Sequence, residues 1–263
     1  MSAFADPILE NQLRRLTNLH EKAQSELSRM LEGHPIAIRC DIHGTDRALS
    51  RELSQPARKP VYAPCATCQA ERKEADTAER IRRAGVPENL CHATFENWIA
   101  ESEVEEAHLA SAREFTKVRR GFLLLIGELG TGKTHLAAAI TRHFRNPLFT
   151  KQSEMLRRLR DFYRDKTARN PVDQAQDADL LVLDEIGLSG GGSDEFPMLH
   201  DVLDHRYNER KPTVLTGNVT LNQLQAVIGE RMADRLRESA FAVLVFGGGS
   251  RRREARGKYF DQA

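Results

Sequence analysis

The chain has 263 residues, of which 40 % are apolar and 29 % charged, a composition that supports a folded core and excludes bulk disorder. With 39 basic and 38 acidic residues its net charge is +1, which excludes a polybasic nucleic-acid binder and leaves only a local basic patch. The sequence has neither a bilayer-spanning apolar run nor a signal-peptide pattern, so we expect a cytoplasmic protein with no membrane partner. Its four cysteines favour a metal site or free thiols over a disulfide scaffold.

The N-terminal third differs from the rest of the chain in its amino-acid composition and pattern. A helix is predicted over about 7–31, where leucines recur at helical spacing before Gly33 and Pro35. This amphipathic helix either packs on its own domain or docks on a partner, and the sequence leaves both open. Residues 36–72 include three cysteines, several turn residues and few large apolar groups. Because this stretch cannot bury enough apolar surface, it needs a cross-link such as a bound metal in order to fold. We expect three domains, over 1–35, 36–85 and 86–263.

From residue 121 onward, short apolar runs alternate with helical patterns. Buried strands separated by helices predict an α/β domain, in which a parallel sheet has helices on both faces. The expected strands cover 122–126, 147–150, 180–183, 213–216 and 241–246. The expected helices cover 71–83, 101–118, 135–144, 153–166, 195–209 and 221–238.

The sequence GELGTGKT at 127–134 matches the phosphate-binding loop pattern G-x-x-x-x-G-K-[ST], with a strand before it and a helix after it. Its glycines let backbone N–H groups surround phosphates, and the helix N-terminus adds a positive end. Lys133 can reach the β- and γ-phosphates, and Thr134 can offer its hydroxyl to Mg²⁺. We therefore expect ATP and Mg²⁺ here. The predicted nucleotide ligands in this segment are Gly127, Gly130, Thr131, Gly132, Lys133, Thr134 and His135.

Two further elements follow apolar strands. Asp184 and Glu185 end the run 180–183, where open α/β sheets bind ligands. We expect Asp184 to hold Mg²⁺ through water and Glu185 to polarise the attacking water. Asn218 follows the run 213–216 and can hydrogen-bond the γ-phosphate or that water. An acidic pair also occurs as an ordinary helix start and an Asn as an ordinary turn, but the upstream phosphate loop favours catalysis.

Four segments occur in this order along the chain: ATFENW at 93–98, the phosphate loop followed by HLAAAI, ADLLVLDEIG at 178–187 and GERMADRL at 229–236. Together they resemble the DnaC-type replicative helicase loaders of the AAA+ superfamily and their relatives, the IstB transposition ATPases. The resemblance extends from about Leu90 to Phe260. It implies an AAA+ P-loop ATPase with a five-stranded parallel sheet between helices. From the residues before it we expect an N-terminal helix and a small zinc-binding module ahead of this ATPase.

The resemblance also carries roles onto matching positions. Asn218 falls at the family's first sensor, Arg235 at its arginine finger and Arg252 at a second sensor that contacts the nucleotide. An arginine supplied by a neighbouring subunit can neutralise the γ-phosphate, whereas a solvated basic helix face is the alternative for Arg235. The segment 91–98 would lie near the adenine. Gly217 stands where the family more often has Ser, Thr or Asn, which we expect to loosen that loop.

The cysteines form a second candidate site. Cys-x-x-His and Cys-x-x-Cys pairs complete a tetrahedron of the kind that structural zinc prefers, with iron as an alternative metal and unpaired thiols as the alternative without one. The metal would be needed for folding, since the segment lacks an apolar core. Cys91 belongs to neither pair, and we expect it to be a small buried residue near the nucleotide. His34 is an alternative ligand for the metal. The predicted zinc ligands are Cys40, His43, Cys65 and Cys68. A zinc module before the ATPase is similar to the arrangement in DnaI-type loaders.

A local basic patch is predicted on and after the helix 153–166. Its arginines and lysine alternate with Phe162 and Tyr163, a pattern that suits single-stranded nucleic acid. Asp161 and Asp165 interrupt the patch, so a solvated face is the alternative. The basic members are Arg157, Arg158, Arg160, Arg164, Lys166 and Arg169. A second patch lies at 251–258.

The resemblance and the motifs favour an ATPase that loads a replicative hexameric helicase onto single-stranded DNA. It would assemble with copies of itself into a ring or spiral and hydrolyse ATP to release the helicase. The alternative is an IstB-like transposition helper that remodels DNA and recruits a transposase. A small-molecule P-loop kinase would leave Arg235 and the cysteine pairs unexplained, and a non-enzymatic adaptor would leave the hydrolytic residues unexplained.

Overall fold

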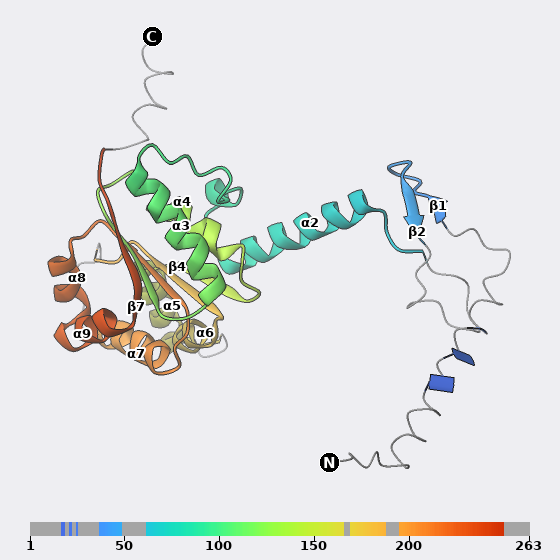
Figure 1. The fold of residues 1–263 in the computed structure, drawn as a ribbon. Helices are drawn as coiled ribbons and strands as arrows, with labels where there is room; N and C mark the ends of the chain where they lie inside the picture. The colour runs from blue at the N-terminus through green and yellow to red at the C-terminus, as the bar shows by residue number, and fades with distance from the viewer. Residues whose placement is uncertain are drawn as a thin grey trace, which may run out of the picture. The chain divides into compact units, whose positions relative to one another are not determined.

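The computed structural model describes residues 17–18, 21–22, 25, 37–48, 62–165, 169–187 and 195–249. The chain divides into two compact units, residues 1–76 and 77–263, and each is described by itself (Figure 1). Within the described part of the chain, none of the helices has the length and apolar character of a membrane span.

The first unit contains a short hairpin followed by the start of a long helix. Strands β1 (Ala37–Arg39) and β2 (Asp46–Ala48) pair antiparallel, and α2 (Ala66–Ala84) begins in this unit and ends in the other. The helix starts earlier than the predicted 71, because Cys65–Cys68 already forms its first turn, with Gln69 N–H donating to Cys65 O. Most of the predicted helix 7–31 lies outside the described residues, and its described residues are helical. The predicted boundaries at 35 and 85 stay a prediction.

The second unit is built on a five-stranded parallel sheet. The strand order is β4-β5-β6-β3-β7, so β6 lies between the strand that precedes the phosphate loop and the strand that precedes the acidic pair. All five strands occur where the sequence predicts them. Their bounds are β3 Phe122–Gly127, β4 Pro147–Lys151, β5 Leu180–Asp184, β6 Thr213–Gly217 and β7 Ala240–Phe246.

Helices cover both faces of this sheet (Figure 1). Alternate side chains of a strand point to opposite faces, so Leu123 and Leu125 join one buried apolar cluster while Leu124 joins the other. The first cluster packs under α3 (Glu103–Val118) and α4 (Lys133–Thr141). The second packs under five helices, which are α5 Gln152–Arg164, α6 Pro171–Asp177, α7 Glu195–Asn208, α8 Leu221–Ile228 and α9 Glu230–Ser239.

Two helical predictions were wrong in detail. The predicted helix 221–238 is two helices, because Gly229 adopts a φ of 82° that ends α8 and starts α9 in a new direction. Helix α4 stops at Thr141, since the next three backbone N–H groups bond to carbonyls three residues back. Helix α6, which the sequence did not predict, begins at an Asn170 cap with Pro171 in its first turn.

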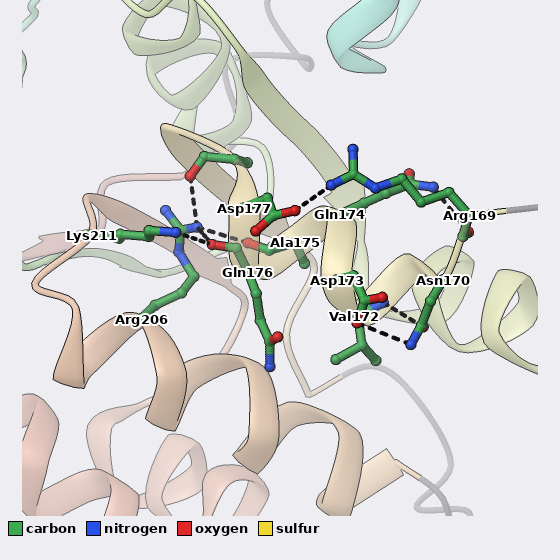
Figure 2. Close-up of polar contacts among 11 residues, drawn as sticks. Arg169, Asn170, Val172, Asp173, Gln174, Ala175, Gln176, Asp177, Arg206 and Lys211 are labelled. Atoms are coloured by element: carbon green, nitrogen blue, oxygen red, sulfur yellow. Dashed lines mark hydrogen bonds and ion pairs between the residues drawn. The ribbon is translucent and has the colours of Figure 1, made fainter.

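A buried arginine joins α7 to the end of α6. Arg206 is fully buried, and its guanidinium donates to the carbonyls of Ala175 (2.7 Å), Ala178 (2.9 Å) and Pro212 (2.6 Å). Lys211 also donates to this helix end, at Gln176 O (2.7 Å) (Figure 2). The last carbonyls of a helix have no partner within it, so these two cations satisfy α6 just before β5 begins. Burial lowers the pKa of Arg206 to about 9, so the side chain stays charged at neutral pH.

Candidate nucleotide site

A pocket of about 1100 Å³ opens at the carboxyl ends of the parallel strands. The phosphate loop forms one part of its lining, and the ends of β4, β5 and β6 form another. Residues between Pro87 and Glu101 supply the rest. Because β6 lies between β3 and β5, Asn218 falls between the phosphate loop and the acidic pair Asp184 and Glu185. The strand order therefore assembles the predicted site residues from three separate segments.

The phosphate loop is closed around its own lysine. Lys133 Nζ donates to Gly127 O (3.1 Å) and Glu128 O, and lies 3.4 Å from Thr131 Oγ1. Burial lowers the pKa of Lys133, whereas the charges of Asp184 and Glu128 act in the opposite direction. Gly127 has a φ of 124°, and a Cβ there would lie 2.0 Å from Phe246 O, so only glycine fits this position.

Asp184 is almost fully buried among hydroxyl donors. Thr134 Oγ1 donates to Asp184 Oδ1 (3.1 Å), and the Thr216 hydroxyl donates to the same oxygen. Burial raises the pKa of Asp184, and these two hydrogen bonds oppose that effect. The structure thus brings together Thr134 and Asp184, the two predicted magnesium ligands. A hydroxyl and a carboxylate are oxygen ligands of the kind that Mg²⁺ takes in proteins, so the pair fits this ion.

Glu185 lies at the mouth of the same pocket in an unusual backbone conformation. Its φ is 57°, in the left-handed region, and such strain often accompanies a functional position. The turn after it is tied down at both ends, since Ile186 N–H donates to Thr216 O (2.8 Å) and Gly187 N–H donates to the buried Gln152 Oε1 (3.0 Å). The Glu185 carboxylate forms an ion pair with Lys151 Nζ at 2.9 Å.

Asn218 also lines the pocket, directly after Gly217. The expected loosening of this loop by the glycine stays a prediction, but the glycine also has a packing reason. A Cβ at position 217 would lie 2.9 Å from Ile186 O and 3.1 Å from Val219 Cγ2. Glycine therefore allows the turns after β5 and β6 to approach each other closely.

One of the two predicted arginines, Arg235, is described by the structure and lies outside this group of residues. Arg235, on α9, is not among the residues that line the pocket. Its guanidinium forms an ion pair with Asp204 of α7 and lies 5.1 Å from the ring centre of Tyr207. Its role as a finger toward a neighbouring subunit stays a prediction. Arg252 lies outside the described residues.

The residues that support the site but were not predicted from the sequence include Lys151, Gln152 and Thr216. Thr216 hydrogen-bonds to Asp184 and to the backbone N–H groups of Glu185 and Ile186. In the sequence it is simply the last residue of the apolar run 213–216, so nothing marks it as part of a site. Lys151 had a usable signal, because it follows a predicted strand and strand ends form the binding edge of such a sheet. Gln152 had none, since its partner lies far along the chain.

Residues 62–258 match the family model described as IstB-like ATP binding protein. The chain belongs to the IstB-like ATP-binding family. This match, together with the similarity to a DnaC helicase loader in sequence and in fold, confirms the predicted resemblance to the DnaC-type loaders and IstB ATPases and the predicted AAA+ fold.

Relatives of this family member include the replicative helicase loader DnaC of Escherichia coli strain K12. The two are 26 % identical over 204 residues, which cover 74 % of this chain and 83 % of that protein. The crystal structure of the DnaC helicase loader is similar with a TM-score of 0.55 and 21 % identity, over 61 % of this chain and 100 % of that one. The crystal structure of DnaI gives a TM-score of 0.53 and 22 % identity, over 63 % and 94 %.

This chain has a second candidate site, a metal site in the first unit, residues 1–76. Cys40, His43, Cys65 and Cys68 each offer one ligand atom, and these atoms all lie within 4.8 Å of one another. Sγ of Cys40 and Sγ of Cys68 are 3.7 Å apart, and His43 Nδ1 lies 3.3–3.9 Å from the three sulfurs. A tetrahedral zinc ion with bonds of about 2.3 Å to sulfur and about 2.0 Å to nitrogen requires separations of about 3.8 and 3.5 Å. The cluster therefore has the dimensions of a structural zinc site.

The surroundings of this cluster support a metal function. His43 Nε2 lies 3.1 Å from Glu71 Oε1, and a carboxylate on the far nitrogen orients a metal-bound imidazole. Cys91 belongs to the other unit and is half-buried, with its thiol 3.6 Å from Pro87 O. Burial raises the pKa of the Cys91 thiol, as expected for a packing residue.

The predicted basic patch is partly neutralised within the chain. Arg157 forms an ion pair with Glu154 (2.6 Å), and Arg169 pairs with Asp177. Arg158 donates to Gln174 Oε1 (2.7 Å). Lys166 lies outside the described residues, and so does the second patch at 251–258. Among the described members, Arg160, Arg164 and Tyr163 on α5 are exposed, and no ion pair of theirs to another described residue is seen.

Proposed function

We propose that this chain is an ATPase that loads a replicative DNA helicase onto single-stranded DNA. The observation that carries the ATPase part is the pocket in which the phosphate loop, Asp184, Glu185 and Asn218 meet. The similarity to Escherichia coli DnaC, which covers most of both chains, supports the loader part.

In this mechanism the phosphate loop and Lys133 bind the β- and γ-phosphates of ATP. Thr134 and Asp184 would hold Mg²⁺, which supplies charge neutralisation on the phosphate oxygens. Glu185 orients the attacking water and accepts its proton, and Asn218 fixes the water or the γ-phosphate from the neighbouring strand end. Lys133 leaves the carbonyls of Gly127 and Glu128 when phosphates replace them as its partners.

Assembly completes the site. Arg235 is proposed to reach the γ-phosphate bound by the next subunit of a ring or spiral, where it would exchange its ion pair with Asp204 for the phosphate. The residues Arg160, Arg164 and Tyr163 are proposed to contact the DNA strand. The N-terminal unit, with zinc in its Cys/His cluster, is proposed to grip the helicase.

The test mixes the full-length chain, the replicative helicase of the same host and circular single-stranded DNA. The expected result is ATP-dependent transfer of the helicase onto the DNA, measured by gel filtration. Lys133→Ala serves as the control that cannot bind phosphates. A chain that hydrolyses ATP but neither captures nor transfers the helicase would contradict the loader function.

The family match favours one alternative, a transposition helper. Such a helper would bind duplex DNA in an ATP-dependent manner and recruit a transposase. The same protein therefore needs to be tested with a transposase and duplex DNA. Capture of the transposase without capture of the helicase would select this function.

A further inference from the structure

One part of the pocket lining, at Asn97 and Trp98, belongs to a hydrogen-bonded turn. Asn97 Oδ1 accepts from Thr94 N–H (2.8 Å), Asn97 N–H donates to Thr94 Oγ1 (3.1 Å), and Asn97 Nδ2 donates to His92 O (2.8 Å). Both ends of the Asn97 side-chain amide are thus bonded to residues of its own turn. We call residues 92–98 the wall turn.

A fourth bond joins the wall turn to the phosphate-binding helix. Nε2 of His135 lies 2.9 Å from Asn97 Oδ1. The amide orientation is fixed by its other partners, a backbone N–H on one side and a carbonyl on the other. Oδ1 is therefore an acceptor, and His135 Nε2 must carry the proton and donate it. His135 follows Thr134 directly, so this bond reaches the first turn of α4.

Aromatic packing strengthens the same junction. The ring of Trp98 lies edge-on to His135 at 5.7 Å and to Phe246 at 6.2 Å between ring centres. Trp98 is almost fully buried, yet it lines the pocket together with Asn97 and His135. It is also the only tryptophan in the sequence.

We infer that Asn97 and His135 are positioning residues, which hold the wall turn against α4 so that the pocket is shaped for the nucleoside before ATP arrives. The inference rests on the proposed function, since the phosphate loop assigns the rest of the lining to the base and ribose. Breaking the bond lets the wall turn move away from a loop that still binds phosphates. ATP affinity then falls, while the hydrolytic residues stay where they are.

The experiment uses the full chain and a ribose-labelled fluorescent ATP, mant-ATP. Energy transfer from Trp98, the sole tryptophan, reports binding at this pocket directly. One hydrogen bond is worth up to about 1.5 kcal/mol, so Asn97→Ala and His135→Phe are expected to weaken mant-ATP binding by about tenfold. KM for ATP rises by a similar factor, whereas kcat changes far less.

Two variants separate the bond from the fold. His135→Gln keeps an N–H at a similar reach and is expected to restore binding to within about twofold of the natural chain. Asn146→Ala, an exposed asparagine outside the pocket, is the matched control. If Asn97→Ala does not fold, the mant-ATP affinities of His135→Phe and His135→Gln still show whether the hydrogen bond supports binding.

The outcomes are distinct. Equal binding by His135→Phe and His135→Gln would overturn the inference, and so would natural affinity in both Asn97→Ala and His135→Phe. Failure of the natural chain to bind mant-ATP would overturn it together with the ATPase proposal. Failure to load a helicase, with the expected changes in mant-ATP affinity, would overturn only the loader proposal.

Discussion

Lys151 Nζ lies 2.9 Å from the carboxylate of Glu185, across two neighbouring parallel strands. The side chains are 45 % and 39 % exposed, so the ion pair is a surface one and worth only about 0.2–1 kcal/mol. It nevertheless occupies the carboxylate that is proposed to orient the attacking water. Glu185 must leave Lys151, at least partly, in order to act.

Lys151→Met is therefore expected to raise ATP turnover in the absence of partners, by up to about fivefold, which is the rate equivalent of an exposed ion pair. Its thermal stability should match that of the natural chain. Steady-state ATPase assays check this. A fall in turnover would mean that Lys151 instead aims Glu185 at the water.

Glu185→Gln is expected to lower turnover by at least about a hundredfold, because the amide cannot accept the proton of the attacking water. ATP binding should persist, since the phosphate loop is untouched. Equilibrium binding of mant-ATP beside the ATPase assay separates the two effects. Normal turnover in this variant would remove Glu185 from its proposed role.

Arg235→Ala is expected to abolish turnover for a different reason, the loss of charge offered to a neighbouring subunit. A mixture of Arg235→Ala and Glu185→Gln chains then regains activity, because an Arg235→Ala site can receive the intact arginine of a Glu185→Gln neighbour. With random equal mixing, half of the sites keep Glu185 and half of these face an intact Arg235, so about a quarter of the activity returns. No recovery would argue against a shared site.

The Cys/His cluster is expected to bind about one zinc ion per chain. Cys68→Ser should lose most of this zinc, whereas Cys91→Ser, whose thiol lies outside the cluster, should keep it. Elemental analysis of the purified full-length variants measures the content. Equal zinc in both variants would contradict the site.

Arg206→Met is expected to lower the free energy of unfolding by about 3 kcal/mol or more, because it leaves several buried carbonyls without a donor. Arg160→Met, at an exposed position on α5, is the control and should change stability by less than about 0.5 kcal/mol. Urea denaturation followed by circular dichroism measures both. Equal midpoints would show that water satisfies the α6 carbonyls.

Much of the fold was predictable from the sequence because its signals are local. The strands β3 to β7 are short apolar runs, and the phosphate loop is one continuous segment between a strand and a helix. The two Cys-x-x pairs are local as well, since each brings its two ligands together within one turn. The break at Gly229 was missed because its apolar pattern continues across it, and only the φ of 82° separates α8 from α9.

The sequence by itself thus determined the strands, the phosphate loop, the acidic pair and the cysteine pairs, whose partners are close neighbours in the chain. Only the tertiary structure decided which distant side chains meet: Lys151 with Glu185, Asn97 with His135, and Arg235 with Asp204. The physical reason is the order of the strands. Placing β6 between β3 and β5 fixes which strand ends share the pocket, and packing on both faces fixes which helices meet, and neither is encoded in any single segment.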